Sequence, residues 1–114
     1  MSRELPRAMF RAIDARDWEA LGTLLHPDLR YDRPGFAPLV GKDEVLRFYR
    51  EVRSIHGEHR LETVVSDGDH GACWGRFVGA KADGTPLDLQ FADCYGFKDG
   101  QLHRRKSFFF VAQV

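Results

Sequence analysis

The sequence lacks most of the features by which common protein classes are recognised. Only two of its 114 residues are cysteines, Cys73 and Cys94, which is too few for the disulfide framework of a small secreted protein and gives no zinc-type spacing. Phosphate-binding glycine loops, nucleophile elbows and cysteine–histidine pairs are also missing. Neither sign of charge is in excess, because 17 Lys and Arg balance 17 Asp and Glu. We therefore expect no nucleic acid and no membrane as partner.

Long apolar runs are absent as well. No run approaches the ~18 residues of a membrane span, and the N-terminal sequence MSRELPRAMF has no apolar segment of the kind found in a signal peptide. We therefore expect a soluble, cytoplasmic protein. Repeats and linkers are missing too, and 114 residues with 43% hydrophobic content suffice for one core. Residues 1–114 are expected to form a single domain.

The first half of the sequence contains helical periodicity. Apolar residues recur every three or four positions from Pro6 to Leu25 and again from Lys42 to Val52, which predicts amphipathic helices. Asp17 is expected to divide the first segment, because its carboxylate can cap the first turn of a second helix. Pro27 is expected to end that helix. A short strand at 29–32 and a loop rich in Pro and Gly follow.

The second half is extended. Four runs rich in β-branched and aromatic residues, separated by turn sequences, occupy residues 61–67, 71–81, 86–97 and 101–112. All three turns contain Asp-Gly, which favours a two-residue type I′ hairpin. SIHGEHR before the first run is expected to be a loop. Helices followed by an antiparallel meander predict an α+β fold with helices packed on one face of a curved sheet.

One of these runs carries an acidic residue among apolar ones. In PLDLQFADCYGF, one face of the strand presents Leu87, Leu89, Phe91, Asp93, Tyr95 and Phe97. Two-residue turns would place Trp74 and Lys106 opposite Asp93, with Arg76 on the same face; a longer second turn would bring Arg105 there instead of Lys106. A sheltered acid on an apolar surface is typical of a small-molecule pocket. A structural ion pair of Asp93 with Lys106 or Arg76 would also explain it.

Three stretches together resemble the SnoaL-like polyketide cyclases: ARDWEALGTLLHPD, the Pro-Gly loop followed by VGKDEVLRFY, and FADCYGFKDGQL. More widely, residues 8–110 are similar to the nuclear transport factor two-like superfamily, which includes ketosteroid isomerase. The resemblance implies N-terminal helices packed on a strongly curved, mainly antiparallel sheet that forms a cone, a cystatin-like α+β barrel. It also implies a ligand pocket inside the cone.

The same resemblance implies roles for individual residues. Asp93 falls on the aspartate of the isomerase oxyanion hole, an acid kept protonated by its apolar site that donates a hydrogen bond to a developing enolate. Tyr49 matches a tyrosine of that network, whereas Met9 occupies the position of its main tyrosine donor.

The resemblance leaves two candidates for the general base. In the isomerase an aspartate precedes a proline. Alignment on Pro34 puts Arg33 at that position, whereas alignment on Gly35, Pro38 and Gly41 puts Asp32 there. In a regular strand Arg33 would follow Tyr31 inward. Asp32 would point inward only through a bulge or turn.

These residues predict a small-molecule enzyme that isomerises, cyclises or dehydrates a small cyclic carbonyl compound by acid–base catalysis. The expected catalytic residues are Asp93 and Asp32, and the expected ligand-binding residues are Tyr31, Arg33, Phe48, Tyr49, Trp74, Arg76, Phe91, Arg105 and Lys106. No cofactor or metal is expected, since His56 and His59 lack a third ligand. The alternatives are a non-catalytic ligand-binding or interaction protein of the same fold, and an epoxide hydrolase with Asp32 as its second carboxylate.

The outer face of the predicted sheet is apolar as well. In the two-residue register it carries Cys73, Phe77, Ala92, Cys94, Phe109 and Val111. Such a face is too apolar to be left open to water, and proteins of this resemblance commonly pair through their sheets. We therefore expect a homodimer through the outer sheet face.

Overall fold

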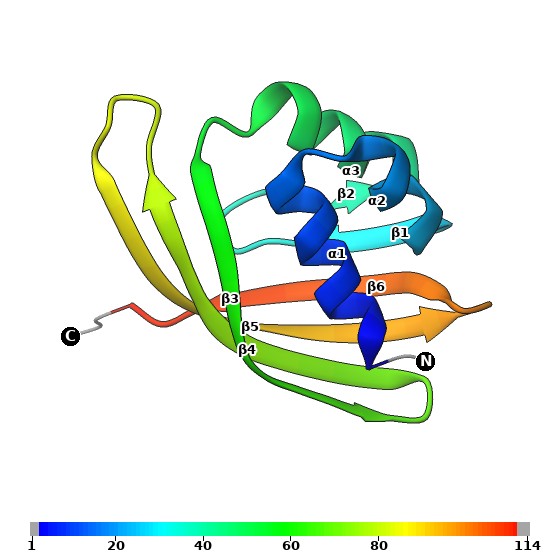
Figure 1. Ribbon diagram of the computed structural model, residues 1–114. Helices are drawn as coiled ribbons and strands as arrows, with labels where there is room; N and C mark the ends of the chain where they lie inside the picture. The colour runs from blue at the N-terminus through cyan, green and yellow to red at the C-terminus, as the bar shows by residue number, and fades with distance from the viewer. Residues whose placement is uncertain (1–2, 112–114) are drawn as a thin grey trace.

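The structure, a computed structural model, describes residues 3–111, in which helical elements cover one face of a single sheet (Figure 1). The helical elements are α1 (Glu4–Ala15), α2 (Trp18–Leu24), α3 (Lys42–Arg47) and the π-helical turn η1 (Phe48–Val52). The strands are β1 (Leu25–Asp32), β2 (Leu39–Val40), β3 (His56–Asp67), β4 (His70–Ala80), β5 (Pro86–Lys98) and β6 (Gln101–Phe109). The predicted α+β class is confirmed.

The two N-terminal helices follow the predicted pattern. α1 buries Met9 and Phe10 and ends at Ala15, and the residue that follows, Arg16, has a left-handed φ of 56°. Asp17 caps α2 as expected, because its Oδ1 accepts a hydrogen bond of 3.1 Å from the backbone N–H of Ala20. The apolar stripes of α1 and α2 therefore hold these helices against the inner face of the sheet.

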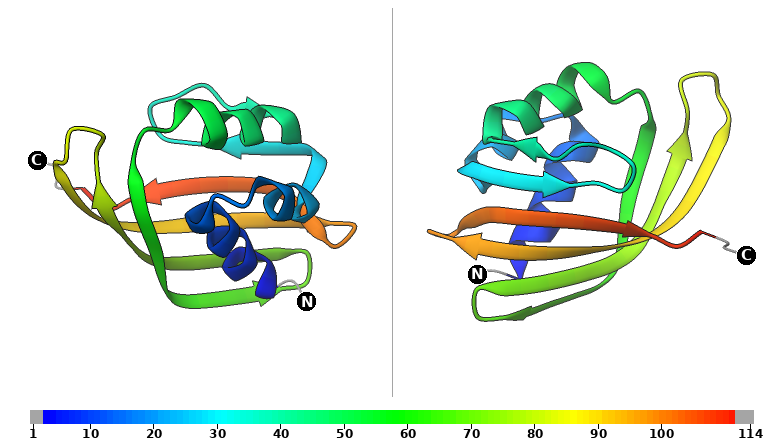
Figure 2. Two further views of the ribbon diagram at one scale, coloured as in Figure 1. Left: turned by 45° about the horizontal axis from the view of Figure 1, so that its top comes forward. Right: turned by 180° about the vertical axis from the view of Figure 1, so that it is seen from behind.

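The strands form a six-stranded sheet in the order β2-β1-β6-β5-β4-β3. β1 and β6 run parallel and the other neighbours run antiparallel, so the sheet is mainly antiparallel, as predicted. The sheet is strongly curved. The start of β3, the end of β4 and the start of β5 bend toward the side that carries the helices (Figure 2). It does not close into a barrel, because β2 and β3 remain its two edges.

The pairing of β4 with β5 differs from the prediction. The strands are joined by a three-residue loop, 82–84, closed by a backbone hydrogen bond of 2.9 Å between the residues on either side. This shift of one residue places Cys73, not Trp74, opposite Asp93. Because side chains alternate along a strand, the shift reverses the face of every β4 side chain. Trp74 and Arg76 point away from the helices, so their predicted inward orientation is wrong.

The pairing of β5 with β6 begins as predicted and then departs from it. The two-residue turn at 99–100 forms, and both of its residues have positive φ, 55° and 74°. A β-bulge next to this turn then shifts the register, so that Ser107, not Lys106, lies opposite Asp93. Lys106 therefore projects from the outer face, which corrects its predicted place in the pocket. Arg105 faces inward.

β3 begins at His56, five residues before the predicted strand at 61–67. Gly57 lies opposite Gly79 of β4, and a Cβ on either residue would collide with the backbone of the neighbouring strand. The glycine in SIHGEHR thus marks the close approach of two strands and not the predicted loop. One consequence is that His59 belongs to the sheet and faces its inner side.

Other element ends differ less from the prediction. β1 begins at Leu25, four residues before the predicted strand at 29–32. β6 ends at Phe109, and the predicted strand end at Ala112 lies outside the described residues.

Between residues 3 and 111 no helix is long and apolar enough to cross a membrane. In the same part of the chain, no three His, Cys, Asp or Glu side chains gather as a metal site.

Candidate active site

A cavity of about 510 Å³ lies between the helices and the inner face of the sheet, which is within the size range of small-molecule sites. Its wall is rich in aromatic rings: Phe10, Tyr31, Phe36, Phe48, Tyr49, Phe77, Phe91 and Phe109. The predicted site residues that line it are Tyr31, Arg33, Phe48, Tyr49, Phe91, Asp93 and Arg105. The predicted pocket inside the curved sheet is therefore present, and most of the predicted residues face it.

Asp93 lies on the floor of this pocket with 0% of its surface exposed. Its Oδ2 accepts hydrogen bonds from the Tyr95 hydroxyl at 2.8 Å and from Arg105 Nε at 2.9 Å. Its Oδ1 accepts a hydrogen bond of 2.6 Å from Ser107. Both oxygens accept and neither donates, which is the hydrogen-bonding pattern of an ionised carboxylate. The shelter predicted for Asp93 is confirmed, but the protonated donor implied by the resemblance does not fit these contacts.

Arg105 connects this carboxylate to the ligand space. Its Nη1 donates a hydrogen bond of 2.7 Å to the Tyr49 hydroxyl, and its guanidinium lies 4.1 Å from the ring centre of Tyr31. Burial alone lowers the pKa of Arg105, but the negative charge of Asp93 raises that pKa well above its ordinary value. The Tyr49 hydroxyl accepts from Arg105, and its own proton has no acceptor within residues 3–111. That proton is therefore available to a ligand.

Hydroxyl groups complete the floor of the pocket. Ser107 donates its single proton to Asp93, so the Tyr31 hydroxyl donates to Ser107 across 3.0 Å. Burial raises the pKa of Tyr31 well above its ordinary value, which keeps this phenol neutral. Burial also raises the pKa of Cys73 to about 11, and the Cys73 sulfur contacts the Tyr95 hydroxyl at 3.3 Å. A protonated thiol of this kind is no nucleophile.

A histidine–aspartate pair forms a second polar part of the pocket wall. His59 Nδ1 lies 2.7 Å from Asp14 Oδ1, and the His59 backbone N–H donates a hydrogen bond of 2.8 Å to Asp14 Oδ2. The imidazole stacks on Phe10 with ring centres 4.3 Å apart. Burial lowers the pKa of His59 more than the hydrogen bond and charge of Asp14 raise it, so the ring is neutral at neutral pH. Its Nδ1 proton then points at Asp14, and Nε2 carries a free lone pair.

His59 also borders the ligand space, because it lines the pocket whereas Asp14 does not. The prediction from sequence missed this pair. Strand parity could have found His59, because counting back in twos from the inward-facing Leu61 reaches it. Asp14 is 45 residues away on α1, and no local pattern predicts that contact.

The structure distinguishes the two candidates for the base position. Asp32 lies outside the pocket lining, and its carboxylate pairs with the Arg30 guanidinium at 3.1 Å. Asp32 therefore does not point into the pocket, which corrects the inward position that its predicted role requires. Arg33 follows the inward-facing Tyr31, lines the pocket and stacks 4.1 Å from the ring centre of Phe48.

Three further predicted ligand-binding residues, Trp74, Arg76 and Lys106, lie on the outer face because of the two register shifts. There Arg76 pairs with Asp88 on exposed sheet surface. The same shifts correct the predicted outer face, because Cys73, Phe77 and Phe109 belong to the inner side.

Comparison with known proteins shows that the chain has a known class of fold. The chain is similar to solved structures of an NTF2-like protein of unknown function from Burkholderia pseudomallei K96243 (22% identity, 94% of this chain and 88% of that chain covered, TM-score 0.85) and a proposed ketosteroid isomerase from Kribbella flavida DSM 17836 (24%, 99% and 80%, TM-score 0.82). It is also similar to that of a proposed SnoaL-like polyketide cyclase from Jannaschia sp. CCS1 (18%, 93% and 83%, TM-score 0.82). At these identities the likeness shows the NTF2-like fold.

The sequence itself identifies the family. The model of the SnoaL-like domain matches residues 7–105, which is most of the chain. The protein therefore belongs to the SnoaL-like family, as the sequence motifs indicate. No protein among the curated ones matches it.

Proposed function

We propose that the protein is an acid–base enzyme that isomerises, cyclises or dehydrates a small cyclic carbonyl compound. One observation carries this proposal: buried Asp93 fixes Arg105, and Arg105 fixes the Tyr49 hydroxyl, whose proton is free for a ligand. Fixed donors of this kind stabilise negative charge that develops on an oxygen in a dry site. Membership of the SnoaL-like family supports the same class of chemistry.

His59 is the residue to which we assign proton transfer, in place of Asp32. Its Nε2 takes a proton from the carbon next to the carbonyl, the C–H electron pair forms the C=C bond of an enolate, and the carbonyl π electrons move to oxygen. That oxygen accepts hydrogen bonds from Tyr49 and Arg105. The imidazolium, steadied by Asp14, returns the proton to another carbon in an isomerisation, or to a departing hydroxyl group in a dehydration.

Asp93 acts in this scheme through Arg105. Each of its oxygens is occupied by donors from the protein, so it positions the guanidinium and does not itself remove a proton. Phe10 is close to both groups, since its ring stacks on His59 and lies 5.2 Å from the Arg105 guanidinium.

Replacing Tyr49 by Phe tests the proposed oxygen site. The variant keeps the ring and removes the free donor, so turnover should fall about 100-fold, as for loss of one donor to a developing oxyanion. The probe is 2-tetralone in D₂O, and the readout is deuterium incorporation next to its carbonyl, followed by NMR. Binding of the ketone, measured by thermal shift, should change little. Equal exchange rates for Tyr49→Phe and the wild type would contradict the proposal.

The alternative functions make different demands on the pocket. A non-catalytic carrier would bind the ketone without accelerating its exchange, so the same assay separates carrier from enzyme. An interaction module with a filled cavity is disfavoured by the 510 Å³ of open volume. An epoxide hydrolase would need a second carboxylate, and Asp93 is the only one that lines the cavity in the described chain.

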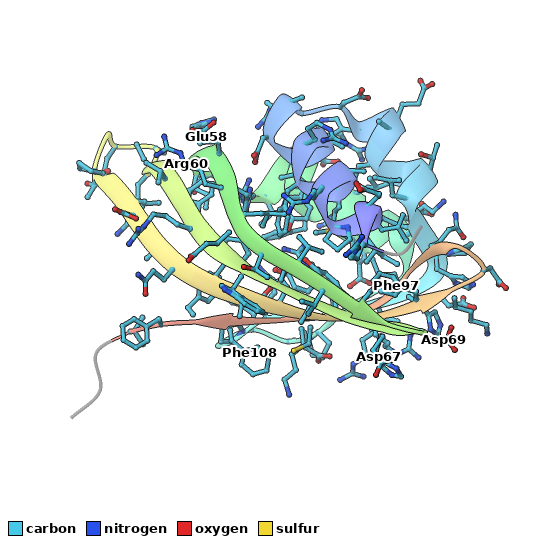
Figure 3. All side chains as sticks on the ribbon, turned by 60° about the horizontal axis from the view of Figure 1, so that its bottom comes forward. Glu58, Arg60, Asp67, Asp69, Phe97 and Phe108 are labelled. Carbon is cyan, nitrogen blue, oxygen red and sulfur yellow. The ribbon has the colours of Figure 1, made fainter. Side chains whose placement is uncertain are left out.

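We also propose that two copies of the chain pair through their outer sheet faces. Trp74, Ala92 and Phe108 form a row across β4, β5 and β6 on the face opposite the helices, and Figure 3 shows Phe108 on that side of the sheet. Trp74 is 42% and Phe108 46% exposed, which leaves an aromatic patch open to water in a single copy. An identical patch on a second copy would cover it.

Substituting Glu for Trp74 or Phe108 should therefore convert a dimer into a monomer, because each copy would bring its new charge into the same apolar contact. Light scattering after size-exclusion chromatography measures the mass. The matched control is Phe36→Glu, an exposed aromatic residue in the loop that follows β1. A monomeric wild type, or a dimer that survives both substitutions, would refute the proposed contact.

A further inference from the structure

Two arginines in the pocket wall have no anionic partner. Arg33 and Arg53 both line the cavity, and neither takes part in the ion pairs formed within residues 3–111. Arg33 Nε is buried and lacks a hydrogen-bond acceptor in that part of the chain. Arg53 is partly buried, and this burial lowers the pKa of its guanidinium. Withdrawing such donors from water without acceptors is unfavourable, so a ligand that supplied acceptors would be stabilised there.

Both guanidinium groups are held against the same short segment. The Arg33 guanidinium lies 4.1 Å from the ring centre of Phe48, and that of Arg53 lies 5.3 Å from the ring centre of Tyr49. These neighbouring rings of η1 have centres 5.0 Å apart. Stacking on aromatic faces orients the planar groups before a ligand arrives. The two cations therefore flank the wall that also presents the Tyr49 hydroxyl.

The charges of the pocket do not cancel. Its lining contains three arginines, Arg33, Arg53 and Arg105, and one aspartate, Asp93. Asp93 is already paired with Arg105, and the neighbouring His59 is neutral. With the Asp14 carboxylate beside His59 also counted, one positive charge remains in excess at an aromatic cavity, where electrostatic attraction to an anion is less weakened than in bulk water.

We propose that the substrate of this pocket is a cyclic compound that carries a carboxylate, bound by Arg33 and Arg53. The planar guanidinium fork matches the two oxygens of a carboxylate, and the aromatic wall packs against the ring of the ligand. A ring carbonyl on the same molecule would reach Tyr49. This inference rests on the proposed function, which makes this pocket the active site. Binding of the acid group can still be tested without turnover.

The test compares acids with their neutral amides. Benzoate and 2-naphthoate are titrated by calorimetry beside benzamide and 2-naphthamide, which have nearly the same shape and no charge. At least one acid should bind the wild type about 10-fold or more tighter than its amide, because hydrogen bonds to a charged carboxylate are stronger than those to a neutral amide. Arg33→Gln and Arg53→Gln should each reduce this preference about 3-fold or more, and the double variant should abolish it.

Two controls identify the cause of any preference. Arg76→Gln removes an arginine from the outer face and should leave the acid preference unchanged. Tyr49→Phe should keep the preference while losing exchange of 2-tetralone, so failure of the acid clamp and failure of the proposed chemistry give different results. The proposal is overturned if no acid binds, if acid and amide bind equally, or if the preference survives in a folded double variant.

Discussion

Replacing Asp93 by Asn is expected to lower the free energy of unfolding by about 3–5 kcal/mol, the usual effect of removing one partner of a buried ion pair. The Arg105 guanidinium, 6% exposed, would remain in the core without its counter-charge. The Tyr95 and Ser107 hydroxyl groups would also face an amide with only one accepting oxygen. Urea unfolding followed by circular dichroism measures the change.

The matched control is Asp88→Asn on the same strand. Asp88 pairs with Arg76 on the exposed face, where an ion pair contributes about 0–1 kcal/mol. Removing both buried charges, with Asp93→Asn and Arg105→Met together, should restore part of the lost stability, because no uncompensated charge would remain. If Asp93→Asn and Asp88→Asn destabilised the protein equally, the buried network could not hold the floor of the pocket as described.

Replacing His59 by Gln is expected to reduce exchange of the probe ketone by about 100- to 10,000-fold, the contribution usual for a positioned acid–base group. The substitution removes the lone pair at Nε2 and keeps a polar side chain at the pocket wall. The wild-type rate should also fall with decreasing pH, because protonation of His59 removes the lone pair. Burial holds the pKa of His59 below its ordinary 6.5, so the midpoint of this fall should lie below pH 6.5.

His56→Gln is the control for this substitution, since His56 is on the same strand and exposed. It should leave the exchange rate unchanged. Asp14→Asn should move the midpoint of the pH profile, because Asp14 holds the Nδ1 proton of His59; a residue with a purely structural role would change only the amount of folded protein. His59 would be ruled out as the base if the fall in exchange rate at low pH kept the same midpoint in the folded Asp14→Asn variant. The same conclusion would follow if that fall persisted in His59→Gln.

The layers of the fold and the place of the acid were predictable from short-range patterns. Helical periodicity depends on neighbours three or four residues apart, and Asp17 caps its helix within the same turn. Alternation along β5 is a property of that strand alone, so Asp93 was correctly assigned to the inner face. Each of these inferences requires only local geometry.

The errors arise at the hairpins, where the assumed number of turn residues sets the register of the whole strand pair. A loop longer by one residue between β4 and β5 moved Trp74 and Arg76 outside, and a single bulge did the same to Lys106. Turn residues such as Asp-Gly fit both a two-residue and a three-residue loop, so the sequence does not specify the register at these turns.

The contacts that complete the site are long-range. Asp14 and His59 meet across 45 positions, and Arg105 and Tyr49 across 56. Such contacts depend on how α1 and η1 sit on the sheet, which periodicity does not determine. Met9 is buried in the core, so the tyrosine donor implied by the resemblance at that position is absent, and Tyr49 is the phenol with a proton free for the ligand.

The most direct test of the proposed chemistry is deuterium incorporation into 2-tetralone by the wild-type protein, at a ketone concentration that raises its melting temperature. We predict an initial rate that is proportional to protein concentration, saturates with ketone, and is lost in His59→Gln. Incorporation at the rate of buffer alone, with the ketone bound, would contradict catalysis in this pocket.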